Sequence, residues 1–98
     1  MIEKIRSGDA DYLIKAFMCL ENSEEFYKFF EDICTVAEIK EMSKRLQAAK
    51  MLKDGMIYND VSEATGLSTA TISRVSRCLK YGSDGYNIVL DRLNDKNS

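Results

Sequence analysis

The sequence predicts an all-α protein that folds as a single small domain. Its 98 residues are 45% hydrophobic and 31% charged, which is the composition of a globular domain rather than of a disordered chain. Apolar residues recur at helical spacing in six segments, and the chain contains no proline that would interrupt them. Because a core this small is marginal in a chain that folds alone, we expect self-association to enlarge it.

The first two predicted helices lie in an acidic N-terminal segment. Asp9 is the expected N-cap of a helix over residues 10–20, whose apolar side chains form one stripe. Ser23 is the expected N-cap of the second helix, which has two glutamates in its first turn, where the helix dipole favours them. The aromatic residues of this second helix exceed one ordinary face: Phe26, Tyr27, Phe29 and Phe30. Either they form a core, or the surplus packs against another subunit.

A capping box, Thr35-Val36-Ala37-Glu38, begins the third predicted helix. In this motif Thr35 accepts a hydrogen bond from the amide of Glu38, and Glu38 accepts one from the amide of Thr35. Gly55 is the expected left-handed residue that ends the helix. The apolar face of the helix is predicted to hold Ile39, Met42, Leu46, Ala49 and Leu52. Four lysines face solvent and receive no function from the sequence: Lys40, Lys44, Lys50 and Lys53.

Residues 58–80 have the spacing of a helix-turn-helix motif. Two helices that cross at roughly 90–120° need a glycine in the turn and apolar residues that lock them together. Gly66 supplies the turn, Leu67 fills the angle, and Asn59 and Ser68 are the expected N-caps of the two helices. The side chains predicted to be buried are Val61, Ala64, Ile72, Val75 and Leu79. The motif departs from its usual template at two positions, Ser62 at the helix crossing and Thr65 before the turn glycine.

The outward face of the second helix in this motif suits DNA. Short side chains at its N-terminal end allow the helix to sit deep in the major groove. Thr71 is placed to meet bases and Ala70 to meet a thymine methyl group, while Ser73, Arg77 and Lys80 are placed for phosphates. The predicted DNA-binding residues are Ser68, Thr69, Ala70, Thr71, Ser73, Arg74, Arg77 and Lys80. A helical hairpin with a merely solvated face is the alternative interpretation.

The distribution of charge changes what the net charge implies. A net charge of −2 argues against a nucleic-acid partner when it is averaged over the chain. Residues 1–39, however, hold four basic and nine acidic side chains, residues 40–80 hold eight and four, and residues 81–98 hold two and three. The segment that contains the predicted helix-turn-helix therefore has a net charge of +4, and the segment before it has a net charge of −5. This split is what a DNA-binding dimer needs, because phosphate contacts supply most non-specific affinity.

Gly82-Ser83-Asp84-Gly85 leads into a last predicted helix. Its apolar stripe consists of Tyr86, Val89, Leu90 and Leu93. The residues from Asn94 to Ser98 are expected to fray.

Several absences exclude other functions. The chain has no histidine, so neither Ser-His nor Cys-His catalysis can be built within it, and we expect no enzyme, catalytic residue or metal site. Cys19, Cys34 and Cys78 are widely spaced in apolar-periodic segments and are expected to be buried free thiols in a reducing cytoplasm. No apolar run is long enough for a membrane span or a signal peptide, so no membrane partner is expected.

Over nearly its full length, the sequence resembles the Trp repressor family, and within it the YerC/YecD type of bacterial proteins. The strongest resemblance runs from Arg45-Leu46 to Gly55 and from Ala70-Thr71-Ile72-Ser73-Arg74 to Leu79-Lys80. It implies a six-helix fold and an intertwined homodimer, in which residues 9–54 and 83–94 mainly provide the dimerisation helices. The two readers, residues 58–80 of each subunit, would enter successive major grooves of a palindromic site, roughly one helical turn apart.

The same resemblance implies a pocket for a small effector at Thr35, Arg45, Arg74 and Cys78. In the family, the indole of tryptophan lies between two arginines, which fall at Arg45 and Arg74, and a threonine carbonyl falls at Thr35. The serine that orients the ligand falls at Cys78, and a glycine beside the pocket becomes Val75, whose branched side chain fills space that the ring needs. We therefore expect no tryptophan corepressor, while another small-molecule corepressor stays open and Arg74 could equally contact phosphate.

The sequence thus predicts a cytoplasmic, homodimeric transcriptional regulator. We expect it to bind a palindromic site in double-stranded DNA through the helix-turn-helix, with repression as the expected outcome. The alternative is a helical interaction module that binds protein through its first two helices and uses the helix-turn-helix only as a scaffold.

Overall fold

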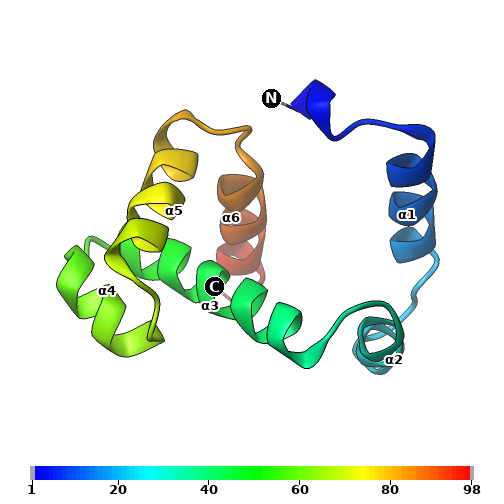
Figure 1. Ribbon diagram of the computed structural model, residues 1–98, viewed down its shortest axis with the longest axis horizontal. Helices are drawn as coiled ribbons and strands as arrows, with labels where there is room; N and C mark the ends of the chain where they lie inside the picture. Colours follow the sequence, from blue (N-terminus) through cyan, green and yellow to red (C-terminus); the bar gives the residue numbers. More distant parts are fainter. Residues whose placement is uncertain (1, 98) are drawn as a thin grey trace. The chain divides into compact units, whose positions relative to one another are not determined.

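The computed structural model describes residues 2–97, with side chains described through residue 95. These residues form six α-helices and one short 3-10 helix, as Figure 1 shows. The six-helix, all-α prediction is therefore confirmed. The chain divides between Ile39 and Lys40 into two compact units. This boundary is also the position at which the sequence changes from acidic to basic.

The first unit contains η1 (Ile2–Lys4), α1 (Gly8–Met18) and α2 (Ser23–Ile33). The predicted caps Asp9 and Ser23 are wrong, because each lies inside the first turn of its helix. The N-cap of α1 is Ser7, whose Oγ accepts from the amide of Ala10 at 3.0 Å. The N-cap of α2 is Asn22, whose Oδ1 accepts from the amide of Glu25 at 3.0 Å. In both cases another residue that favours the N-cap position lies one or two positions before the predicted one, and its side chain accepts a hydrogen bond from a free amide of the first helical turn.

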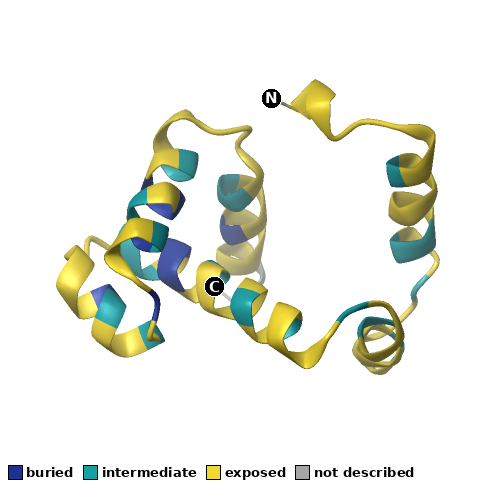
Figure 2. Cartoon of the chain, in the orientation of Figure 1, coloured by how far each residue is buried: buried dark blue, intermediate teal, exposed yellow. Residues whose placement is uncertain are grey.

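An aromatic cluster joins α1 to α2. The ring centroid of Phe17 lies 5.4 Å from that of Phe29, 5.7 Å from that of Phe30 and 6.4 Å from that of Phe26. None of the helices of this unit has a buried residue in the part of the chain that is described (Figure 2). Tyr12 and Met18, for example, are 77% and 79% exposed. A single copy of this unit therefore has ring contacts but leaves a large apolar surface uncovered.

The second unit is built from α3 (Val36–Lys53), which begins before the boundary, and from α4 (Tyr58–Thr65), α5 (Thr69–Tyr81) and α6 (Gly85–Asn97). Its core has two clusters of buried residues, which Figure 2 shows in dark blue. One consists of Ala48, Val61, Leu67 and Ile72, and the other of Ala49, Val75 and Leu90. Ala48 and Ala49 are neighbours in α3 and contribute to different clusters, so α3 packs against α4 and α5 on one side and α5 and α6 on the other. The prediction that Ala64 is buried is wrong, because Ala64 lies on the exposed side of α4.

Both ends of α3 follow the prediction. The amide of Thr35 donates to Glu38 Oε1 at 2.8 Å, and the amide of Glu38 donates to Thr35 Oγ1 at 3.1 Å. These bonds from Thr35 hold the pKa of the Glu38 carboxyl below its ordinary value. The stability that this cap contributes is therefore present above the pKa of the unfolded glutamate and is lost as the pH falls through the lower folded pKa. At the other end Gly55 has φ +94°, and its amide donates to the carbonyl of Leu52 at 3.0 Å, which closes the helix as expected.

Two further helix boundaries correct the sequence prediction. Asn59 is not the N-cap of α4, because the helix begins at Tyr58 and Ile57 takes the cap position without a side-chain hydrogen bond. The fraying expected from Asn94 is not seen, because α6 continues to Asn97, while Ser98 lies outside the described residues. α6 is started by Asp84 at φ +72°, whose Oδ1 accepts from the side chain of Asn87 at 2.9 Å.

The cysteines are free thiols, as predicted, but they are less buried than predicted. Cys19 is exposed at the C-terminal end of α1, and Cys34 and Cys78 are half-buried. Among the described helices, none is both long and apolar enough to cross a membrane.

Candidate nucleic-acid interface

The helix-turn-helix forms around a tight turn between α4 and α5. Gly66 adopts φ +77°, and its amide donates to the carbonyl of Ser62 at 2.8 Å. Leu67, which is only 5% exposed, fills the angle between the helices, and Val61 and Ile72 are fully buried beneath it. The packing expected from the sequence around the turn is thus present, and it fixes the direction of α5 relative to α4.

Two hydroxyl groups fasten the turn at the positions that depart from the usual template. Ser62 Oγ donates to the carbonyl of Leu67 at 2.7 Å. Thr65 Oγ1 donates to the carbonyl of Val61 at 2.7 Å and accepts from the amide of Leu67 at 3.2 Å. These departures therefore replace apolar packing with hydrogen bonds to backbone groups of the turn that would otherwise need other partners.

Replacing Gly66 with alanine is expected to lower the free energy of unfolding by about 1–2 kcal/mol, because an L side chain is disfavoured in the left-handed region. An added Cβ would meet only Lys44 Nζ, at 4.0 Å, so the cost comes from the backbone and not from a clash. Gly85→Ala is the matched control, since Gly85 has neither a positive φ nor a neighbour within 4 Å of the added Cβ. Urea unfolding followed by circular dichroism measures both variants. Equal stabilities for the two would contradict the prediction.

The predicted DNA-binding residues lie along α5. Ser68 is its N-cap, as predicted, with Oγ accepting from the amide of Thr71 at 3.2 Å. Ser68 Oγ also donates to Thr71 Oγ1 at 3.1 Å, so these two hydroxyls hold each other in place at the start of the helix. Thr71 and Ser73 are half-buried rather than fully outward-facing. The exposed members of the set are Ser68, Thr69, Ala70, Arg74, Arg77 and Lys80.

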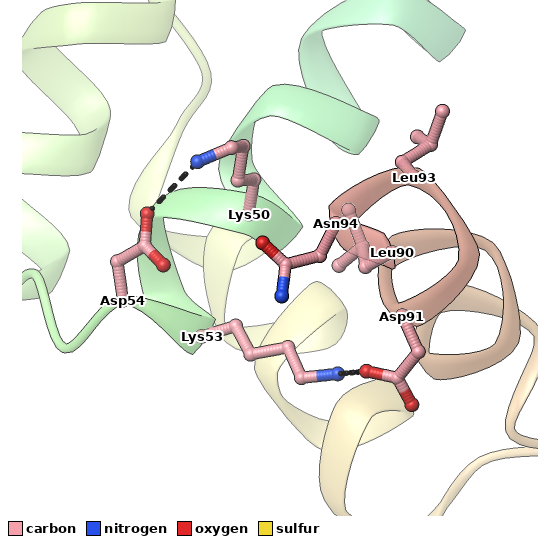
Figure 3. Close-up of a pocket in the computed structure, with 7 residues that line it drawn as sticks. All are labelled: Lys50, Lys53, Asp54, Leu90, Asp91, Leu93 and Asn94. Atoms are coloured by element: carbon pink, nitrogen blue, oxygen red, sulfur yellow. Dashed lines mark hydrogen bonds and ion pairs between the residues drawn. The ribbon is translucent and has the colours of Figure 1, made fainter. Parts of the chain in front are cut away.

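Two lysines of α3 are held in ion pairs, unlike the cations of α5. Lys50 Nζ lies 3.1 Å from Asp54 Oδ2, and Lys53 Nζ lies 2.7 Å from Asp91 Oδ1 on α6. Figure 3 shows both pairs at the rim of a pocket of about 300 Å³. Its lining is Lys50, Lys53, Asp54, Leu90, Asp91, Leu93 and Asn94. This pocket was not predicted from the sequence: the spacing of Lys50 and Asp54 signals one pair, but nothing local links Lys53 to Asp91.

The cations of α5, in contrast, make no ion pair within the described part of the chain. Arg74, Arg77 and Lys80 are all exposed, and no carboxylate lies within salt-bridge distance of them among the described residues. Their charge is therefore not neutralised locally. An unneutralised stripe of cations beside short side chains is the surface that phosphate groups require.

A second pocket, of about 190 Å³, collects most of the expected effector residues. Arg45, Arg74 and Cys78 all line it. Thr35, the fourth expected residue, belongs to the other unit and is not part of the lining. Val75 also lines the pocket and is only 3% exposed, so its side chain is packed into the protein at this side of the pocket. The lining residues that the sequence analysis missed are Glu41, Thr71 and Tyr86.

The charges in this second pocket act on one another. Arg45 Nε lies 3.8 Å from a carboxylate oxygen of Glu41. Burial raises the pKa of the Tyr86 phenol, and the charge of Cys78 adds to the rise, while the positive charges of Arg45 and Arg74 partly oppose it. Tyr86 therefore remains a neutral hydrogen-bonding group at neutral pH. The pocket offers two cations, one carboxylate and short polar groups, but no group of three His, Cys, Asp or Glu side chains able to hold a metal occurs among the described residues.

The chain is similar to known proteins of one family over most of its length. Residues 9–94 match the protein family of the Trp repressor. The chain belongs to the Trp repressor family. Proteins of this family are regulators and not enzymes, which agrees with the expectation from the sequence.

Similar proteins match almost the whole chain. A Bacillus subtilis protein called YerC, itself uncharacterised, is 46% identical over 94 residues, which are 96% of this chain and 90% of that protein. A crystal structure from Staphylococcus aureus, provisionally named a Trp repressor, has a TM-score of 0.89 and 52% identity, and covers 96% of this chain and 94% of that one. A TrpR-like protein from Eubacterium eligens has a TM-score of 0.89 and 47% identity, with 94% and 95% coverage. The resemblance inferred from sequence, including its YerC type, is confirmed.

Proposed function

We propose that this Trp repressor family member is a sequence-specific regulator that reads double-stranded DNA through α4 and α5. The observation that carries the proposal is the exposed stripe of Arg74, Arg77 and Lys80, which has no ion pair among the described residues and follows a rigid turn. Short side chains at Thr69 and Ala70 leave room for the start of α5 to approach base edges. Phosphate contacts would set the position of the protein, and the start of α5 would supply specificity.

The regulator acts as a homodimer in this proposal, with α1, α2, α3 and α6 mainly as the dimerisation helices. Support comes from the first unit, which has no buried residue in its described part and exposes Tyr12, Met18 and Tyr27. A second copy would cover such a surface. Two-fold symmetry then calls for a palindromic site in the DNA. Repression in the cytoplasm is the proposed mode of action.

The deciding experiment is enrichment of genomic DNA by the native protein, followed by titration of the enriched fragments at several salt concentrations. We expect a palindromic motif with half-sites roughly one helical turn apart and an affinity that falls linearly on a log–log plot against salt. Sedimentation of the same sample should give twice the 11.2 kDa of one chain. A monomer that shows no salt-dependent binding to DNA would refute the proposal and would favour a protein-interaction module instead.

Tryptophan is expected not to bind the proposed dimer. Val75 and Cys78 narrow the pocket between Arg45 and Arg74, and Val75 is held in place by its packing against Ala49 and Leu90. Isothermal titration calorimetry with tryptophan should therefore show only the heat of dilution. Micromolar binding would contradict this prediction and would identify tryptophan as the effector.

A further inference from the structure

α4, the first helix of the reader, carries no positive charge, although its place in the motif brings it close to DNA phosphates. In a helix-turn-helix, this helix crosses the DNA backbone while the second helix enters the groove. α4 carries Asp60 and Glu63 and no basic side chain. A phosphate that faces α4 would therefore be repelled unless a cation came from another element.

Lys44 of α3 places a cation beside the turn that follows α4. Its Nζ lies 4.0 Å from the point where a Cβ on Gly66 would stand, so the amine lies directly beside the turn between α4 and α5. Lys44 is one helical turn before Ala48, which packs in the same cluster as Leu67 and Ile72. Its helical position thus directs the side chain toward the turn, and the side chain is exposed there.

Three of the four other cations of α3 lie beside a carboxylate, and the fourth, Lys40, does not come within 4 Å of the point beside Gly66 that Lys44 Nζ reaches. Lys50 and Lys53 are held by Asp54 and Asp91, and Arg45 lies beside Glu41. Lys44 makes no ion pair within the described part of the chain. Its charge therefore adds to that of α5 at the turn, instead of being neutralised along α3.

We infer that Lys44 is a DNA-binding residue that contacts a backbone phosphate beside the turn of the reader and so replaces the cations that α4 lacks. This inference rests on the proposed function. A contact with phosphate fixes the position of the protein on the duplex and carries no sequence information. Removal of Lys44 should therefore weaken binding to every sequence by the same factor.

The test compares three variants of the full chain on a random-sequence DNA duplex and on an enriched genomic site. Lys44→Ala should lower affinity on the order of tenfold for both DNAs, and it should reduce the log–log salt slope by about 2, or about 1 for each subunit of the dimer. Lys44→Arg should restore affinity and slope, because the charge is kept. Lys50→Ala is the matched control: the same residue type on the same helix, but paired with Asp54.

The outcomes separate this inference from the function on which it rests. If the wild type binds with strong salt dependence and Lys44→Ala has the same slope as Lys50→Ala, the role of Lys44 is refuted and the proposed function stands. If Lys44→Ala weakens one DNA much more than the other, a phosphate contact is likewise refuted. Binding of the wild type without salt dependence overturns both. Lys44→Arg keeps the test valid where alanine alters folding, and thermal melting of each variant reports such a change.

Discussion

Replacing Arg77 and Lys80 together with alanine is expected to lower the affinity for duplex DNA by roughly a hundredfold or more at low salt. The double variant removes four cations from the proposed dimer, and each phosphate contact contributes about 0.9 to the log–log salt slope, so the slope should fall by about 3 to 4. Both side chains are exposed and neither joins a core cluster, so the fold should be retained. Fluorescence anisotropy of a labelled duplex, titrated at several salt concentrations, measures affinity and slope together.

The control for this variant removes the same number of charges elsewhere. Lys50 and Lys53 also carry positive charge in the second unit, but each forms an ion pair with a carboxylate. The Lys50→Ala, Lys53→Ala double variant should keep a slope close to that of the wild type. If both double variants lose affinity equally, DNA senses only the net charge of the protein, and α5 is not the reading helix.

Ile72→Ala should cost about 2–5 kcal/mol of unfolding free energy, the range found when a large buried side chain is truncated. Ile72 has no exposed surface and packs with Ala48, Val61 and Leu67, where α3, α4 and α5 meet. A loss of this size is a large fraction of the roughly 5–15 kcal/mol that stabilises a small domain. Urea unfolding followed by far-ultraviolet circular dichroism is the measurement.

Ile57→Ala provides the comparison for Ile72→Ala. Ile57 is 63% exposed and lies outside both proposed dimerisation segments, so the same change of side chain should cost less than about 1 kcal/mol. Similar losses at the two positions would mean that Ile72 is not at the centre of the reader's core.

How well the sequence predicts a helix start depends on how many capping residues compete there. Thr35 and Glu38 satisfy each other's amides, so their capping box predicts a single helix start. At α1 and α2, Ser7 precedes Asp9 and Asn22 precedes Ser23, and only the path of the backbone decides which oxygen reaches a free amide. Sequence patterns locate these helices but not their first residue.

The features of the candidate site that lie close together in the sequence could be predicted, whereas contacts between distant residues could not. The turn glycine, the buried Ile72 and Val75 and the exposed cations of α5 are all encoded within residues 58–80, and the structure has them as expected. The contact of Lys53 with Asp91 joins residues 38 positions apart, and the position of Lys44 at the turn depends on how α3 packs. Pairings of this kind follow from tertiary packing, which no local pattern contains.

The two adjacent alanines of α3 have a consequence for how the reader can move. Ala48 and Ala49 point about 100° apart around the helix, and neither has any exposed surface. Any shift of α5 along or away from α3 would therefore break close contacts in both clusters at once. We therefore expect the reader, α6 and the part of α3 that packs between them to move together as one block. An effector that alters the distance between two readers in the dimer would have to do so by bending the chain outside this block, without reshaping the reading surface itself.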